Sequence, residues 1–215
     1  AYPALAKLTS LRNSYARRDL WCLTITDFKK GNELQKPGMY IDGNIHSNEI
    51  QGAEFALYTA WYLTESFGDT KFIQELLEDK VFYIVPSINP DGRDSYMHQP
   101  NTSSSPRSGI KPVDNDGDGL VNEDWYDDLD GDGHITMMRR KNVNGRYKLD
   151  PRDPRNMVMA NADEQGDYEL LGMEGIDNDG DGRVNEDGYA FEYDPNRDWG
   201  WGWQPNYIQN GAYKY

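Results

Sequence analysis

The sequence predicts an α/β fold, with a mixed and mostly parallel β-sheet flanked by helices. In residues 1 to about 95, short apolar runs of strand length alternate with longer segments of helical periodicity. From about residue 97 to 193, Gly, Pro, Asp, Asn and Ser dominate and the periodicity fades, which indicates a long insertion that has a function or is ordered by ligands. A chain of 215 residues can bury one sizeable core, so we expect residues 1–215 to belong to a single domain.

Each expected element rests on the spacing of its apolar residues. Helical spacing predicts helices over residues 4–16, 50–63 and 72–77. Short continuous apolar runs predict strands over residues 20–26, 39–45 and 81–85. The middle helix is apolar on most sides, which is the pattern of a helix that packs against a sheet.

The acidic residues are concentrated in two short stretches. The formal net charge is -15, and fourteen of the 37 acidic residues lie between positions 114 and 132 or between 177 and 187. Such crowding opposes a compact state unless positive charge is bound there, so divalent cations are the expected partners. The same charge would repel phosphates, and no apolar run approaches the roughly 18 residues that span a bilayer. We therefore expect no nucleic-acid partner and no membrane span.

An acidic motif occurs twice, as DNDGDGLVNED at 114–124 and as DNDGDGRVNED at 177–187. Carboxylates at alternate places, a glycine at the sixth place and a backbone carbonyl at the seventh are typical of calcium-binding loops. We therefore expect two calcium sites, each closed by an acid of its own copy. The expected ligands are Asp114, Asp116, Asp118, the Leu120 carbonyl and Glu123 or Asp124 in the first copy, and Asp177, Asp179, Asp181, the Arg183 carbonyl and Glu186 or Asp187 in the second.

A third, weaker loop of the same kind follows the first copy. Asp128, Asp130 and Asp132 alternate, but the loop has no closing acid of its own, so we expect Asp124 or Asp127 to complete it. A solvated acidic loop without an ion is the alternative for all three segments. Bound calcium would order a stretch that is too polar to bury a core. Because such loops suit the calcium levels found outside the cytosol, we expect a secreted protein or one of the bacterial cell envelope or periplasm.

A histidine and a glutamate stand three residues apart where a predicted strand gives way to a predicted helix. His46 follows the strand and Glu49 enters the helix, so an imidazole nitrogen and a carboxylate can converge on one ion. Nitrogen and oxygen ligands, with one position left for water, are what catalytic zinc uses. Open α/β sheets also bind ligands beyond the carboxyl ends of their strands. Taken alone, the pair is a weak signal, and a surface histidine beside a helix-capping glutamate is the commoner interpretation.

Three later motifs favour zinc. Residues 89–92 read Asn-Pro-Asp-Gly, a tight-turn sequence after a predicted strand; Arg107 follows; and residues 194–199 read Asp-Pro-Asn-Arg-Asp-Trp. In this order, together with His46-x-x-Glu49, they resemble the zinc carboxypeptidases of the M14 (carboxypeptidase A-like) family. The resemblance runs from about residue 4 to the end of the chain, interrupted by the acidic insertions. It implies a zinc carboxypeptidase-like α/β fold, with this chain as the N-terminal part of the catalytic domain.

The resemblance also implies a role for each matching residue. His46 and Glu49 match the first two zinc ligands. Arg107 matches the arginine that polarises the scissile carbonyl and stabilises its oxyanion. Asn196 and Arg197 match the pair that binds the substrate's terminal carboxylate, and a guanidinium binds a carboxylate through two charge-assisted hydrogen bonds. The implied activity is zinc-dependent removal of the C-terminal residue from a peptide or protein.

The family's third zinc ligand, a histidine, and its general-base glutamate lie beyond the Asn-Arg motif. We therefore expect both after Tyr215, in a remainder of the catalytic domain that acts as this chain's partner, and we expect residues 1–215 alone to hydrolyse no peptide. His98 and His134 are poor substitutes, because one follows the Asn-Pro-Asp-Gly motif too closely and the other lies inside an acidic loop. Two positions depart from the family: Asn48 stands where an arginine is common, and Asp198 where an asparagine is commoner.

Two other functions remain open from the sequence. A different zinc amidohydrolase of the same fold would act on a cell-wall peptide or an N-acyl amino acid. A calcium-dependent binding module, or an inactive relative, would keep the fold without the reaction. The intact His46, Glu49 and Asn196-Arg197 motifs disfavour the inactive relative.

Overall fold

The computed structural model describes residues 2–102, 106–114, 117–122, 124–185 and 193–213. The chain divides into two compact units. The first comprises residues 1–99, 103–113 and 191–215, and the second comprises residues 100–102 and 114–190. The second unit thus covers most of the insertion that the sequence predicts over about 97–193.

The first unit is built on a four-stranded sheet with the order β1-β2-β4-β3. The strands are β1 (Ala6–Asn13), β2 (Asp19–Ile25), β3 (Gly38–Asp42) and β4 (Val81–Val85). β2 pairs antiparallel with both β1 and β4, whereas β3 pairs parallel with β4. The α/β class and the mixed sheet are therefore confirmed, but only one of these three pairings is parallel, which is less than predicted.

Residues 4–16 contain a strand, so the helix predicted there is wrong. β1 pairs with β2 from Ala6 opposite Ile25 to Asn13 opposite Asp19. Leu8 and Leu11, whose spacing suggested a helix, are both more than half exposed. The spacing therefore marks no buried helical face. Pairing with the neighbouring strand overrides the local preference of the segment.

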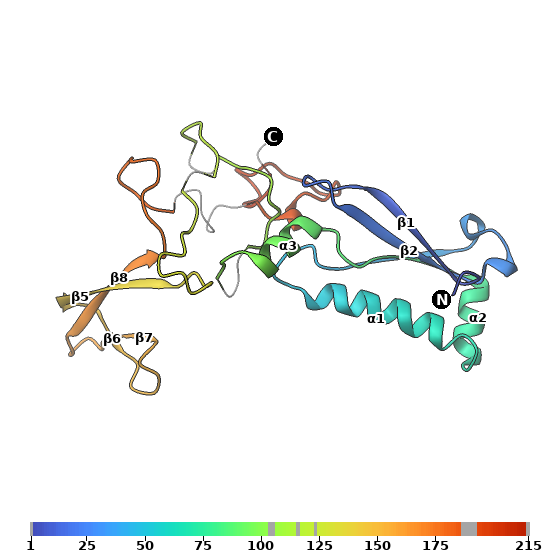
Figure 1. The fold of residues 1–215 in the computed structure, drawn as a ribbon, viewed down its shortest axis with the longest axis horizontal. Coiled ribbons are helices and arrows are strands. Elements are labelled where there is room, and N and C mark those ends of the chain that lie inside the picture. Colours follow the sequence, from blue (N-terminus) through green and yellow to red (C-terminus); the bar gives the residue numbers. More distant parts are fainter. Residues whose placement is uncertain (1, 103–105, 115–116, 123, 186–192, 214–215) are drawn as a thin grey trace. The chain divides into compact units, whose positions relative to one another are not determined.

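Two helices pack with this sheet, as predicted (Figure 1). α1 (Gln51–Glu65) contacts β2, β3 and β4, and α2 (Lys71–Asp79) lies beyond its C-terminal end and leads into β4. Short 3₁₀ helices are η1 (Phe28–Lys30), η2 (Glu33–Gln35) and η4 (Pro195–Arg197). The buried core joins the sheet to both helices. Its residues are Ile25, Ala56, Ala60, Leu63, Ile73, Leu77, Phe82 and Ile84.

Leu77 is the most direct test of this core, because it is wholly buried between α2 and the sheet. Leu77→Ala is expected to lower the free energy of unfolding by about 3 kcal/mol, since it removes buried methyl groups and leaves a cavity. Leu34→Ala is the matched control, because Leu34 is 79% exposed. Chemical denaturation followed by circular dichroism measures both variants. Equal losses for the two would contradict the described core.

Residues 89–92 begin a helix, where the sequence suggested a tight turn. α3 (Pro90–His98) has Asn89 as its N-cap, and the Asn89 side-chain oxygen accepts a hydrogen bond of 3.0 Å from the Gly92 amide. Pro90 occupies the first helical turn, where its missing N–H costs nothing. Asn and Pro serve both turns and helix starts, so the motif alone does not separate the two.

The second unit contains a four-stranded sheet that the sequence did not reveal. Its order is β5-β8-β6-β7, and all its pairings are antiparallel. The strands are β5 (Met137–Gly145), β6 (Tyr147–Leu149), β7 (Met157–Met159) and β8 (Gly166–Met173). Few of their side chains are fully buried, so the two-residue alternation of a half-buried strand is weak.

Candidate active site

The loop between β3 and α1 is folded by a buried asparagine. Asn44 adopts a left-handed conformation with φ of 55°, and its side-chain NH₂ group donates to the carbonyls of His46 (2.8 Å) and Ser47 (3.2 Å). Its side-chain oxygen accepts from the Ser87 hydroxyl after β4. A short polar side chain tolerates this conformation better than most. Asn44 therefore sets the direction in which His46 leaves the strand.

The same loop holds the segment that carries Arg107. The Ser47 amide donates to the Arg107 carbonyl at 3.1 Å, and the Ser47 hydroxyl donates to the Pro106 carbonyl. Asn89 adds a second connection, since its NH₂ group donates to the carbonyls of Ile45 (3.0 Å) and Ser108 (3.1 Å). These buried hydrogen bonds fix the backbone of residue 107 beside His46.

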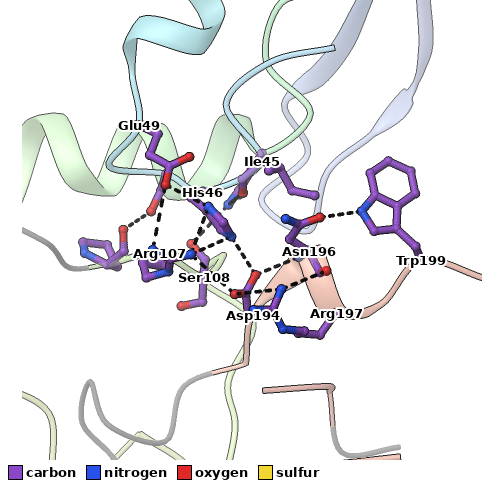
Figure 2. Close-up of polar contacts among 12 residues, drawn as sticks. Ile45, His46, Glu49, Arg107, Ser108, Asp194, Asn196, Arg197 and Trp199 are labelled. Carbon is purple, nitrogen blue, oxygen red and sulfur yellow. Dashed lines mark hydrogen bonds and ion pairs between the residues drawn. The ribbon is translucent and has the colours of Figure 1, made fainter. Parts of the chain in front are cut away.

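His46 lies between two carboxylates, one three residues and the other 148 residues away in the sequence (Figure 2). Its Nδ1 is 3.0 Å from Glu49 Oε1, and its Nε2 is 2.8 Å from Asp194 Oδ1. The imidazole is buried, whereas 57% of the Glu49 side chain is exposed. The protein thus encloses the His46 ring, whereas the Glu49 carboxylate is accessible to solvent.

Each ring nitrogen of His46 faces one carboxylate. In the tautomer whose Nε2 proton is directed at Asp194, Nδ1 carries the lone pair. Nδ1 and Glu49 Oε1 are then two acceptors that face each other, and they need a cation between them. The Arg107 guanidinium lies against the whole ring, with Nη2 at 3.1 Å from Nδ1 and 2.9 Å from Nε2, and its Nη1 lies 3.8 Å from Glu49 Oε1.

An imidazole nitrogen and a carboxylate that share one cation are a donor set that fits zinc. The hydrogen bond from Nε2 to Asp194 strengthens this fit, because metal-binding histidines usually donate their second ring N–H to a carboxylate or carbonyl. Among the described residues, no third His, Cys, Asp or Glu completes a group of three around His46 and Glu49.

Asn196 and Arg197 lie beside this pair, on η4. The Asp194 side chain caps η4 by accepting from the Asn196 amide at 2.8 Å, and its Oδ2 is 3.8 Å from Arg197 Nη1 and 3.6 Å from Arg107 Nη2. Asp194 therefore connects His46 with both arginines. Burial raises its pKa, but the Asn196 amide, the hydrogen bond with His46 and the charges of His46 and Arg197 outweigh burial and lower the pKa.

Tryptophans near η4 orient its side chains. The Trp199 indole donates to Asn196 Oδ1 at 2.8 Å, so the Asn196 NH₂ group is turned away from Trp199. The Trp203 indole donates to Asp198 at 3.2 Å. Trp201 is 97% exposed. Trp199 and Trp203 thus pack around the turn, whereas Trp201 makes little contact with it.

The structure brings together five residues that the sequence singled out, which are His46, Glu49, Arg107, Asn196 and Arg197. It adds Asp194, to which sequence reasoning gave no role. His98 lies at the end of α3, where its Nδ1 contacts the Asp94 carbonyl, and the His134 amide donates to Asp132 in the third acidic loop.

The three acidic loops share one local geometry. In each, the first aspartate accepts the backbone amides three and five residues later, as Asp177 does from Gly180 (2.6 Å) and Gly182 (3.0 Å). Both of these glycines have positive φ, and glycines occupy the same places in the other two loops. Asp116, Glu123, Glu186 and Asp187 were predicted as ligands and lie outside the described residues.

Two acidic groups in the second unit lie close enough to share an ion. One joins Asp124 to Asp177 and Asp179, and the other joins Asp128 and Asp130 to Glu174; within each group the carboxylate oxygens are all within 4.8 Å. The structure thus places Asp124 with the second repeat. In the third loop, Glu174 rather than Asp124 or Asp127 forms a group with Asp128 and Asp130. Both groups join residues that are far apart in the sequence, and the linear motifs do not reveal such groups.

The fold and the site define an α/β protein with a candidate metal centre beside two arginines. The family model of zinc carboxypeptidases (Peptidase_M14) matches residues 1–213. The chain therefore belongs to the zinc carboxypeptidase family, and the resemblance seen in the sequence is confirmed.

Curated relatives agree with this assignment. Carboxypeptidase D of Anas platyrhynchos is 31% identical over 125 residues, which cover 58% of this chain and 9% of that protein. The carboxypeptidase N catalytic chain of Rattus norvegicus is 34% identical over 103 residues, covering 47% of this chain and 22% of that protein. The matches thus span less than a quarter of the length of these relatives.

A solved structure of bovine thrombin-activatable fibrinolysis inhibitor, in complex with tick carboxypeptidase inhibitor, is also similar. It has a TM-score of 0.41 and 24% identity, with coverage of 56% of this chain and 34% of that one. Among the described residues, no helix is long and apolar enough to cross a membrane.

Proposed function

We propose that the protein carrying this chain is a zinc-dependent metallocarboxypeptidase that hydrolyses the C-terminal peptide bond of peptides or proteins. One observation carries the proposal: His46 Nδ1 and Glu49 Oε1 lie 3.0 Å apart, with the Arg107 guanidinium beside both and the Asn196-Arg197 pair joined to them through Asp194. Membership of the zinc carboxypeptidase family supports it.

His46 and Glu49 would hold the zinc, and bound zinc would supply the Lewis acidity that activates a water molecule. Asp194 orients the His46 ring and stabilises positive charge on it. We place a third ligand, a histidine, and the general-base glutamate in a remainder of the catalytic domain outside these 215 residues. Residues 1–215 would then form its N-terminal part.

The arginines and the amide would bind the substrate. Arg107 carries donors on a side chain that is 35% exposed, which suits it to stabilise an oxyanion at the scissile carbonyl. Arg197 presents a charged fork that is 42% exposed. With its oxygen engaged by Trp199, Asn196 presents N–H donors, so Asn196 and Arg197 together suit a terminal carboxylate.

We also propose that the acidic loops bind calcium and thereby order the second unit. The repeated loop geometry and the two groups of converging carboxylates support this role. A secreted or cell-envelope location would supply calcium at the levels that such loops require.

The zinc centre is tested by the metal content and zinc affinity of variants. His46→Ala and Glu49→Gln are expected to weaken zinc binding by at least about a hundredfold, since each removes one of few ligands. His98→Ala is the control, because His98 is exposed on α3 and contacts Asp94 rather than His46. Competition with a chromophoric chelator measures the affinity. Zinc binding by His46→Ala equal to that of the wild type would disprove the assignment.

The substrate class needs a separate measurement on the complete protein. Peptides with a free C-terminal carboxylate are expected to release their last residue, whereas the same peptides with a C-terminal amide should react far more slowly. Arg197→Lys should raise the KM for the free-carboxylate peptides, because lysine lacks the bidentate fork. Equal rates on both sets of peptides would point to another amide substrate, such as a cell-wall peptide or an N-acyl amino acid.

A further inference from the structure

Asp124, the last residue of the first acidic repeat, has a buried carboxylate. Its residue exposure is 0%. Oδ1 accepts a hydrogen bond of 2.6 Å from the Asn178 amide, but Oδ2 is buried and has no hydrogen-bond partner among the described residues. A buried, ionised oxygen without a partner is costly, so such groups are paired with a cation or bind a metal.

The groups that face Asp124 carry the same charge. The carboxylate oxygens of Asp124, Asp177 and Asp179 lie within 4.8 Å of one another. Within the described ranges, none of the three forms an ion pair with a lysine or arginine. The three carboxylates thus repel one another in the absence of positive charge.

We propose that Asp124 of the first repeat completes the metal loop of the second repeat, so that one calcium ion is bound by Asp124, Asp177 and Asp179. This inference rests on the proposed calcium role of the loops, and it changes which residues form the site. An all-oxygen set from a flexible loop suits calcium, whereas zinc favours nitrogen and sulfur and magnesium keeps most of its water.

The proposed site lies at the base of the paired strands β5 and β8. Asp124 precedes β5 and Asp177 follows β8, while Met137 pairs with Met173 where the two strands begin and end. Other bonds join the same two segments: the Asp127 amide donates to the Glu174 carbonyl, and Asn178 Nδ2 donates to Asp127 Oδ2 at 3.1 Å. An ion at Asp124 would therefore link the segment that leads into β5 with the segment that follows β8.

The second acidic group does not carry the same argument. Glu174 is buried, but its two oxygens accept from the amides of Leu129 (2.7 Å), Asp130 (3.2 Å) and Thr136 (3.3 Å). These bonds already satisfy the carboxylate and join the loop to the end of β8. Asp124 thus differs from Glu174 in having a carboxylate oxygen without a hydrogen-bond partner.

Asp124→Asn tests the shared site, with calorimetric calcium titration and thermal melting of the complete protein. Asparagine keeps the acceptor for the Asn178 amide and removes the charge. We expect one class of calcium site to weaken by about tenfold or more. In calcium-free buffer the variant should melt at the same temperature as the wild type or higher, because the mutual repulsion is relieved. Asp163→Asn, which removes an exposed acid outside the loops, should match the wild type in both measurements.

The partner in the other repeat provides a second, independent check. Asp177→Asn should weaken the same class of site, and the double variant should lose less than the sum of the two single losses, because both residues bind one ion. Calcium binding by Asp124→Asn equal to that of the wild type would overturn the shared site and leave each loop with its own ion. A wild-type protein that binds no calcium would overturn the calcium role of the loops altogether.

Discussion

Gly43→Ala is expected to lower the free energy of unfolding by about 3 kcal/mol and to weaken zinc binding by at least about tenfold. Gly43 is the first residue after β3. A Cβ atom there would lie 2.4 Å from the Gly52 carbonyl oxygen and 2.6 Å from the Gly52 carbonyl carbon. These are backbone atoms of the first turn of α1, so the helix has to move. His46 and Glu49 lie between the two contacting glycines, and metal–ligand distances tolerate only about 0.2 Å of change.

Gly68→Ala is the control for this prediction. Gly68 follows α1, an added Cβ atom would have no neighbour within 4 Å, and the backbone is not in the positive-φ region. Its substitution should therefore leave stability and zinc affinity unchanged or slightly raise stability. Denaturation curves measure the stability of both variants, and chelator competition measures their zinc affinity. A Gly43→Ala protein with wild-type melting and zinc affinity would show that the approach of β3 to α1 does not position the ligands.

The parts of the fold that could be predicted are those with a large apolar signal. β4 (Val81–Val85) was predicted with the same bounds, and α1, α2 and β2 were predicted within a few residues. Each buries side chains in the core. β1 was wrong because most of its side chains are exposed and its conformation depends on hydrogen bonds to β2. The β5–β8 sheet was missed for the same reason, since backbone pairing rather than burial defines it.

The site could be predicted only as far as local motifs reach. His46 and Glu49 are three residues apart, and Asn196 and Arg197 are adjacent, so short motifs reveal both pairs. Asp194 is 148 residues from its His46 partner, and Asp124 is more than fifty residues from Asp177. No periodicity or spacing links such residues. Asp194 did leave a weak signal, because an Asp before Pro-Asn is a typical helix start, but that reading gives it a structural role alone.

Asp194→Asn tests whether Asp194 positions the zinc site or only caps η4. Both the His46 Nε2 contact and the Asn196 amide bond go to Oδ1, which asparagine retains. The substitution therefore keeps the cap and the shape, and it removes the negative charge that faces His46, Arg107 and Arg197. We expect zinc affinity to fall about 10- to 100-fold, which is typical when a carboxylate behind a metal-binding histidine is lost.

Asp198→Asn separates this effect from a general disturbance of the turn. Asp198 lies on the same turn and accepts from the Tyr213 amide and the Trp203 indole, but it has no contact with His46. Its variant should bind zinc as the wild type does. Since a capping role would change only stability, a fall in zinc affinity at unchanged melting temperature assigns Asp194 to the metal site. The reverse pattern, with lower melting temperature and unchanged zinc affinity, would show that His46 is a ligand that does not need Asp194.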